Sequence, residues 1–140
     1  MINRAIKVAV MAHEEQTDKA GLPYILHPLT VMTYVDGIDA KIVAILHDVV
    51  EDTEVTLVDL RDVFKFDEHI VEAVRAITHL PNEPNVEYWN RVCDNPLAKQ
   101  VKYADIRHNS SNKRMMVLDE KTFLRLSTKY VKAQEYLDAH

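Results

Sequence analysis

Glycine occurs only twice in the 140-residue chain, at Gly21 and Gly37. This scarcity argues against a turn-rich β fold and against a glycine-rich phosphate loop, because both need residues that readily adopt positive φ. The apolar residues instead recur mainly at the spacing of an amphipathic helix. We therefore expect an all-α fold, a compact bundle of seven or eight helices with no convincing strand.

Caps and breakers place these helices along the chain. Pro28 suits the first position of a helix, with His27 at its N-cap, and Gly37 is a stop signal. Thr56 and Asp59 resemble a capping box. The expected helices cover residues 3–16, 28–37, 39–51 and 56–64, a stretch capped by Asp67, a short stretch around Trp89, and residues 95–109 and 119–136. The third of these is apolar nearly all round, so we expect it to be buried.

The chain is long enough to build its own core. A chain near 150 residues buries roughly two thirds of its unfolded surface, and 47% of the residues here are hydrophobic. No linker divides the chain, so we expect one domain over residues 1–140. Cys93 is the only cysteine, which excludes an intrachain disulfide. There is no secretory signal and no apolar run of the roughly 18 residues that span a bilayer, so we expect a cytoplasmic protein without a membrane partner.

The formal net charge of −5 limits the partners. Nonspecific binding to a nucleic acid duplex depends on Lys and Arg neutralising the phosphates, so we expect no nucleic acid partner. A small anionic substrate is compatible with the charge, because a metal ion and a few basic side chains dominate the local field.

Residues 47–52 (HDVVED) place four ionisable side chains at the end of the apolar third helix. On a helix, residues four apart share a face, so His47 lies on the same face as Glu51, and Asp48 on the same face as Asp52. Burying a carboxylate costs several kcal/mol unless it is paired or bound to a metal. The segment therefore indicates a cation site, and the alternative is a helix end that has surfaced into solvent.

Two further segments help to distinguish a cation site from an exposed helix end. In residues 102–109 (KYADIRHN), Asp105 and Asn109 share a helix face, whereas His108 points away from Asp105. His27 lies in a proline-flanked loop, where a structural or exposed histidine is the alternative to a ligand.

Three segments resemble motifs of a known protein family: residues 21–28 (GLPYILHP), 45–53 (ILHDVVEDT) and 101–109 (VKYADIRHN). They resemble the hydrolase domain of the Rel/SpoT alarmone enzymes and the small stand-alone alarmone hydrolases, a branch of the HD metal-dependent phosphohydrolases. The match covers about residues 6–115, and the HDVVEDT string is specific to this branch. No synthetase domain follows, so the resemblance implies hydrolysis alone.

In that family the metal ligands are a loop histidine, the HD pair and a distal aspartate. The matching residues here are His27, His47, Asp48 and Asp105. Two neutral imidazoles and two carboxylates balance one divalent ion and leave two octahedral positions for a water and a phosphate oxygen. Mixed nitrogen and oxygen ligands suit Mn²⁺, Fe²⁺ or Co²⁺ better than Mg²⁺, and the resemblance points to Mn²⁺.

The resemblance also implies roles around the metal. Glu51 and Asp52 match an acidic pair that orients the attacking water and manages its proton; the alternative is a pair of surface acids bound to Lys41 or Arg61. Lys19 and Asn109 match substrate-binding residues. An ordinary exposed lysine and a helix C-terminal residue are the respective alternatives.

One departure concerns the base-binding side. Long Rel enzymes usually carry an arginine before the loop lysine, where it packs on guanine, but this chain has Asp18. Ser110 also stands where the family more often has an apolar residue. Both changes leave hydrolysis plausible and put guanine selectivity in doubt.

These patterns favour a hydrolase that removes a 3′-pyrophosphate from a (p)ppGpp-like nucleotide. A nucleotide phosphatase or phosphodiesterase of the broader HD superfamily is the second hypothesis. A nucleotide-sensing module with a degenerate site is the third, and the intact ligand set argues against it.

Overall fold

The computed structural model describes all 140 residues, and they form helices and connecting loops only. In chain order the elements are α1 (Ile2–Ala12), α2 (Leu26–Thr33), α3 (Ile38–Leu46), α4 (Val49–Asp52), the π-helical segment η1 (Asp59–Val63), α5 (Glu68–Ile77), α6 (Asn85–Cys93), α7 (Pro96–Asn109), α8 (Asn112–Met115) and α9 (Glu120–Ala139). The only β-type pairing is an isolated bridge between Thr17 and Pro23. The expected all-α fold is confirmed.

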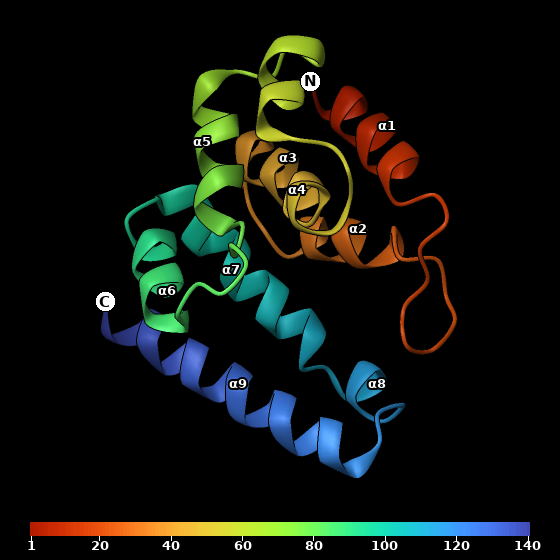
Figure 1. Ribbon diagram of the computed structural model, residues 1–140, viewed down its shortest axis with the longest axis vertical. Coiled ribbons are helices and arrows are strands. Elements are labelled where there is room, and N and C mark those ends of the chain that lie inside the picture. The colour runs from red at the N-terminus through yellow and green to blue at the C-terminus, as the bar shows by residue number, and fades with distance from the viewer.

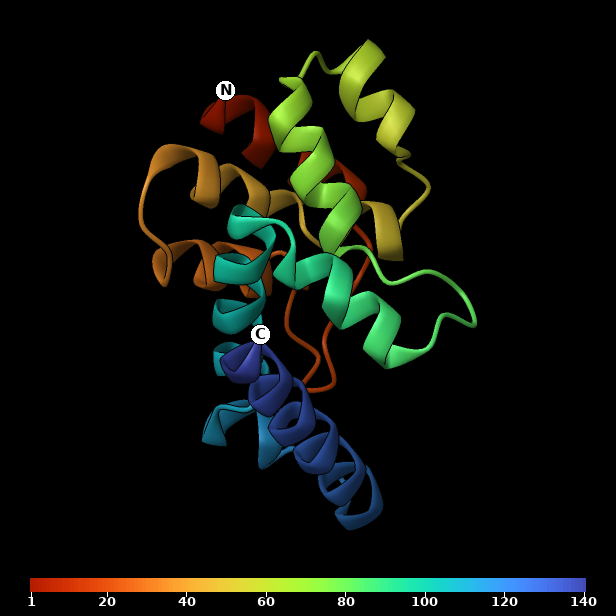
Figure 2. The same ribbon diagram turned by 90° about the vertical axis from the view of Figure 1, so that its left-hand side faces the viewer.

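Helix α3 lies at the centre of the molecule. It packs against α1, α2, α5 and α7 (Figure 1). Its residues from Ile42 to Leu46 are at most 2% exposed, and they belong to a single cluster of 29 buried apolar residues. The prediction of a buried helix apolar nearly all round is therefore confirmed. Helix α9 contacts α6 and α7 and lies at the opposite end of the molecule from α1 and η1 (Figure 2).

The expected helix over residues 39–51 is in fact interrupted at His47 and Asp48. Nδ1 of His47 donates to the Ala44 carbonyl at 2.6 Å, so the imidazole is hydrogen-bonded to a backbone carbonyl in the last turn of α3. Asp48 then adopts φ −101° and ψ −4°, and α4 begins at Val49. This break and the short helix α8, in a stretch expected to be a loop, explain why there are more helical segments than the eight expected.

The start of α2 also differs from the expectation. The helix begins at Leu26, so His27 lies in its first turn and not at the N-cap, which is Ile25. The backbone bond from His27 N to the Tyr24 carbonyl, at 3.0 Å, shows that the chain is already turning before Pro28. Helix α1 ends at Ala12 and not at residue 16.

Helix α2 ends at Thr33, before Gly37, which instead forms the N-cap of α3 with φ +90°. The Lys41 ammonium closes the end of α2 by donating to the carbonyls of Met32 and Val35, at 3.2 and 2.7 Å. None of the helices combines the length and the apolar character needed to cross a membrane.

The predicted capping box is confirmed, α7 has a side-chain cap at Asn95, and the predicted cap at Asp67 differs. Thr56 and Asp59 exchange backbone-to-side-chain hydrogen bonds of 3.0 and 3.1 Å, the pattern of a capping box. Asn95 accepts from the Ala98 amide at 3.0 Å. Asp67 occupies the N-cap of α5, but its side chain makes no capping bond.

Candidate metal centre

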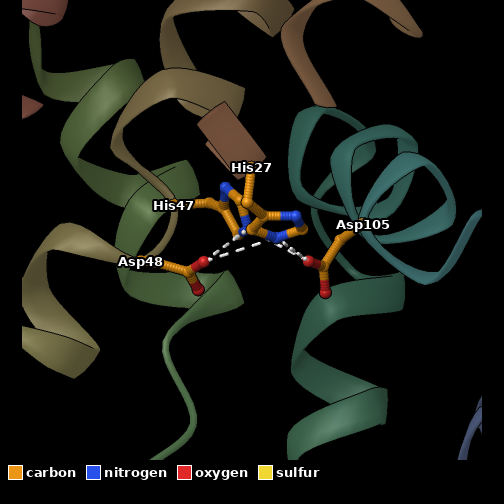
Figure 3. A group of neighbouring side chains, drawn as sticks. All are labelled: His27, His47, Asp48 and Asp105. Atoms are coloured by element: carbon orange, nitrogen blue, oxygen red, sulfur yellow. Dashed lines mark hydrogen bonds and ion pairs between the residues drawn. The ribbon is translucent and has the colours of Figure 1, made fainter. Parts of the chain in front are cut away.

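Four side chains from distant parts of the chain meet at one point. His27 comes from α2, His47 and Asp48 from the break between α3 and α4, and Asp105 from α7 (Figure 3). Their nearest imidazole nitrogens and carboxylate oxygens all lie within 4.8 Å of one another. Because α2, α3 and α7 pack against each other, the helix packing itself assembles this group.

Asp105 Oδ1 is the shared contact of the two imidazoles. It lies 2.9 Å from Nε2 of His27 and 3.1 Å from Nε2 of His47. Asp48 Oδ2 lies 3.1 Å from the same atom of His47 and 3.6 Å from that of His27. All four residues are at most 9% exposed. Such buried carboxylates require compensation by a cation or by hydrogen bonds.

The imidazoles are held through their other nitrogen. Nδ1 of His47 donates to the Ala44 carbonyl, which leaves Nε2 as the nitrogen that points toward Asp48 and Asp105. Nδ1 of His27 lies 2.7 Å from Nδ1 of His108. Both Nε2 atoms therefore face the same space.

Three further side chains bond to the carboxylates, and two of them were missed in the sequence. The Tyr24 hydroxyl donates to Asp48 Oδ2 at 2.6 Å, and the Lys102 ammonium lies 3.2 Å from Asp105 Oδ2. Asn109 Nδ2 donates to Asp105 Oδ1 at 3.0 Å. The spacing of three between Lys102 and Asp105 is a helical pair and was a usable signal, whereas the contact of Tyr24 depends on tertiary packing.

The electrostatics of this group favour a positive charge between the carboxylates. Burial works to lower the pKa of the His47 imidazole, but Asp48 and Asp105 outweigh it and hold that pKa well above its usual value. Burial likewise opposes ionisation of Asp105, yet Lys102 and the two histidines hold its pKa well below the usual range. Two imidazole nitrogens and two carboxylate oxygens form a donor set that fits one divalent ion.

Glu51 and Asp52 lie beside this group on α4. One carboxylate oxygen each from Asp48, Glu51 and Asp52 lie within 4.8 Å of one another. Partial burial, together with Asp48 and Glu51, raises the pKa of Asp52 to about 6. Partial burial also raises the pKa of Glu51, whose Oε1 accepts from the His79 amide at 2.7 Å.

The alternative pairing of these acids with basic surface residues does not occur. Lys41 bonds to the carbonyls at the end of α2, and Arg61 pairs with the neighbouring Asp62 at 3.0 Å. The acidic pair is thus open to a ligand in the adjoining cavity.

Two spaces adjoin the four-residue group. A cavity of about 160 Å³ is lined by the acidic pair, by Tyr88 and Trp89, and by Lys102 and Lys129. A groove of about 570 Å³ lies between the loop that follows α1 and helices α8 and α9. Lys19 lines the groove, and Asn109 lines both spaces. The structure thus brings both predicted substrate-binding residues to the ligand-sized groove.

Asp18 stabilises the loop that follows α1 and borders the groove. Its Oδ1 accepts from the amides of Ala20 and Leu22 at 2.8 and 3.0 Å, which closes the loop around Gly21. Its Oδ2 lies 3.7 Å from a guanidinium nitrogen of Arg114 on α8. Asp18 stands where the resemblance places the arginine of long Rel enzymes, and the guanidinium that lines the groove here belongs to Arg114.

The comparisons with known proteins point to alarmone enzymes. A guanosine-3′,5′-bis(diphosphate) 3′-pyrophosphohydrolase of Aquifex aeolicus is 37% identical over 83 residues, which cover 56% of this chain and 12% of that protein. A probable GTP pyrophosphokinase of Mycobacterium leprae is 32% identical over 128 residues, which cover 83% of this chain and 16% of that protein. The chain thus spans less than a fifth of the length of these relatives. No protein-family model matches it.

A solved structure shares the fold. It is that of a metazoan ortholog of SpoT that hydrolyzes ppGpp and plays a role in starvation responses, with a TM-score of 0.79 and 22% identity. The match covers 97% of this chain and 84% of that one. The two chains therefore share the same all-α fold. The resemblance to Rel/SpoT-type hydrolase domains, expected from the three sequence segments, is confirmed by both comparisons.

Proposed function

We propose that the chain is a divalent-metal-dependent hydrolase that removes pyrophosphate from the 3′ position of a (p)ppGpp-like nucleotide. One observation carries this proposal: the four predicted ligands converge between a groove of nucleotide size and a small cavity that holds the acidic pair. Ligand pockets in proteins commonly measure about 300–1,000 Å³, and the groove falls within this range.

His27, His47, Asp48 and Asp105 are the proposed metal ligands, and Mn²⁺ is the proposed ion. Their mixed donor set suits Mn²⁺, Fe²⁺ or Co²⁺ better than Mg²⁺. When bound, such an ion lowers the pKa of a coordinated water and polarises a phosphoryl oxygen. Tyr24 and Lys102 orient the two carboxylates, a supporting role that commonly decides metal affinity.

The acidic pair is proposed to handle the proton of the reaction. Hydrolysis forms a bond between the water oxygen and the phosphorus and breaks the bond between that phosphorus and the ribose 3′ oxygen. Asp52, with a pKa of about 6, is ionised near neutral pH and accepts the proton that the water loses. The 3′ oxygen leaves as the ribose hydroxyl and takes the proton that Asp52 has accepted. Glu51, fixed by the His79 amide, orients the water.

The two spaces support a substrate with a diphosphate at the 3′ position. In the proposed pose the nucleoside lies in the groove with Lys19 and Asn109, and the terminal phosphate lies in the cavity beyond the ligands. Lys102 is already bound to Asp105. Lys129, an exposed lysine that lines the cavity, makes no ion pair and is the cation available to that phosphate.

The deciding experiment is a turnover assay. The Mn²⁺-loaded protein is incubated with guanine and adenine nucleotides that carry a 3′-diphosphate, a 3′-monophosphate or no 3′-phosphate, and pyrophosphate and orthophosphate are measured separately. Asp48→Ala protein, purified identically, controls for contaminating phosphatases. Pyrophosphate released only from 3′-diphosphates is the expected result. Orthophosphate from monophosphates would instead indicate a general phosphatase, and no product from any nucleotide would indicate a sensing module.

A further inference from the structure

His108, near the end of α7, lies directly behind the proposed ligand His27. The two Nδ1 atoms are 2.7 Å apart. The ring centroids are 5.0 Å apart and the planes differ by 14°, so the two rings meet edge to edge, nearly in one plane. Helical spacing predicts no role for His108, because on an isolated helix this residue turns away from Asp105. Its actual partner is in α2, 81 positions away along the chain.

A contact of 2.7 Å between two ring nitrogens requires one hydrogen between them. In the proposed metal centre Nε2 of His27, which lies 2.9 Å from Asp105 and 3.6 Å from Asp48, offers its lone pair to the ion. A neutral imidazole carries only one N–H, which then lies on Nδ1 of His27. His108 must therefore accept that hydrogen with its own Nδ1 and carry its proton on Nε2.

The other proposed imidazole ligand also has an acceptor behind its Nδ1 atom. His47 is held in the same way by a different acceptor, the Ala44 carbonyl, at 2.6 Å. Each proposed imidazole ligand thus has one acceptor on its Nδ1 side.

We propose that His108 is a positioning residue that fixes the tautomer and the ring orientation of His27 for metal binding. The inference rests on the proposed metal centre and adds to it a residue that touches neither the ion nor the reacting atoms. Partners of this kind typically change metal affinity 10- to 100-fold when they are removed.

The test measures the Mn²⁺ dissociation constant of the full chain by isothermal titration calorimetry. His108→Phe keeps an aromatic ring next to His27 but has no acceptor, so we expect Mn²⁺ affinity to fall about 10- to 100-fold. His108→Asn keeps an acceptor, because its Oδ1 can take the place of Nδ1, and we expect affinity close to that of the wild type. His69→Phe makes the same change at an exposed histidine that pairs with Asp39, and it serves as the matched control.

The outcomes separate this inference from the proposal on which it rests. A wild-type chain that binds no Mn²⁺ would refute the metal centre itself. If the wild type binds Mn²⁺ and His108→Phe binds it equally well, the metal centre stands and the role of His108 is wrong. Circular dichroism shows whether His108→Phe is folded. Should it unfold, His108→Ala also removes the acceptor and is judged by the same comparison with His108→Asn.

Discussion

Nε2 of His27 lies 2.9 Å from Oδ1 of Asp105, although 78 positions separate the two residues along the chain. The contact exists because α2 and α7 pack against each other and both pack on the buried helix α3, which ends at Leu46, directly before His47. The geometry of the candidate site is thus a consequence of the core. A substitution at the site can therefore remove a ligand while most of the packing is kept.

Asp48→Ala should lose the metal ion. The change removes one carboxylate of the donor set, and the remaining ligands carry only the single negative charge of Asp105. We expect no stoichiometric Mn²⁺ after desalting, measured by elemental analysis on folded protein. Asp39→Ala, an exposed aspartate on α3, should retain the ion. Stoichiometric Mn²⁺ in the Asp48→Ala variant would rule out its assignment as a ligand.

Glu51→Gln should keep the metal ion and lose most turnover. The amide oxygen of glutamine can still accept from the His79 amide, so the side chain stays in place while its negative charge is lost. General acid–base groups typically contribute about 10²- to 10⁴-fold, and we expect kcat to fall within that range. Glu54→Gln, an exposed neighbour, is the control. Unchanged kinetics in Glu51→Gln would move this residue to a structural role.

The sequence predicted the parts of the site that belong to short motifs. The ligand set and the acidic pair were expected from residues 21–28, 45–53 and 101–109. The structure brings these ligands together. The interruption after Leu46 was not predicted, because apolar periodicity continues through it and the bond of His47 to a carbonyl leaves no trace in the pattern.

The contacts that support the ligands could not be predicted from the sequence either. Tyr24 reaches Asp48 across 24 positions, and His108 reaches His27 across 81. Such contacts depend on the relative placement of packed helices, which helical spacing within one segment does not encode. Local chemistry, such as the capping box of Thr56 and Asp59, was predictable because its partners are three residues apart.

Tyr24→Phe should weaken metal binding without unfolding the protein. It removes only the hydroxyl, which donates to Asp48 Oδ2 at 2.6 Å, and leaves the ring that packs near His13 and His27. We expect the Mn²⁺ dissociation constant to rise about 10-fold or more. Tyr103→Phe, which removes a hydroxyl bonded to Asp138 on the surface, should bind Mn²⁺ like the wild type. Equal affinity in the two variants would contradict a supporting role for Tyr24.

Lys129→Gln should reduce the preference for 3′-diphosphates. If this lysine contacts the terminal phosphate, its loss lowers kcat/KM for a 3′-diphosphate and leaves that for any 3′-monophosphate substrate unchanged. A charge-assisted hydrogen bond is worth about 1.5–3 kcal/mol, which corresponds to roughly a 10- to 150-fold loss. Lys132→Gln, an exposed lysine on the same helix, tests for a general effect of charge. Equal losses in both variants would argue against a specific contact.

Glu83→Gln should lower stability in a pH-dependent way. Arg91 donates to both carboxylate oxygens of Glu83 and, at 2.7 Å, to the Thr78 carbonyl, so the pair holds the loop that carries His79. The hydrogen bonds from Arg91 lower the pKa of Glu83 from 4.5 to about 2. A carboxyl whose pKa is depressed on folding stabilises the protein above its unfolded pKa and loses this effect as the pH falls through its folded pKa.

At pH 7 the free energy of unfolding of Glu83→Gln should therefore lie roughly 1–3 kcal/mol below that of the wild type. The difference should shrink between pH 4.5 and about 2, because the wild-type carboxyl is then protonated as well. Urea unfolding at pH 7, 4.5 and 2.5 measures both quantities, with the exposed Glu87→Gln as the control. A difference that stayed constant over this range would mean that the charge of Glu83 is not what stabilises the loop. The fixed position of Glu51, which depends on the His79 amide, would then need another explanation.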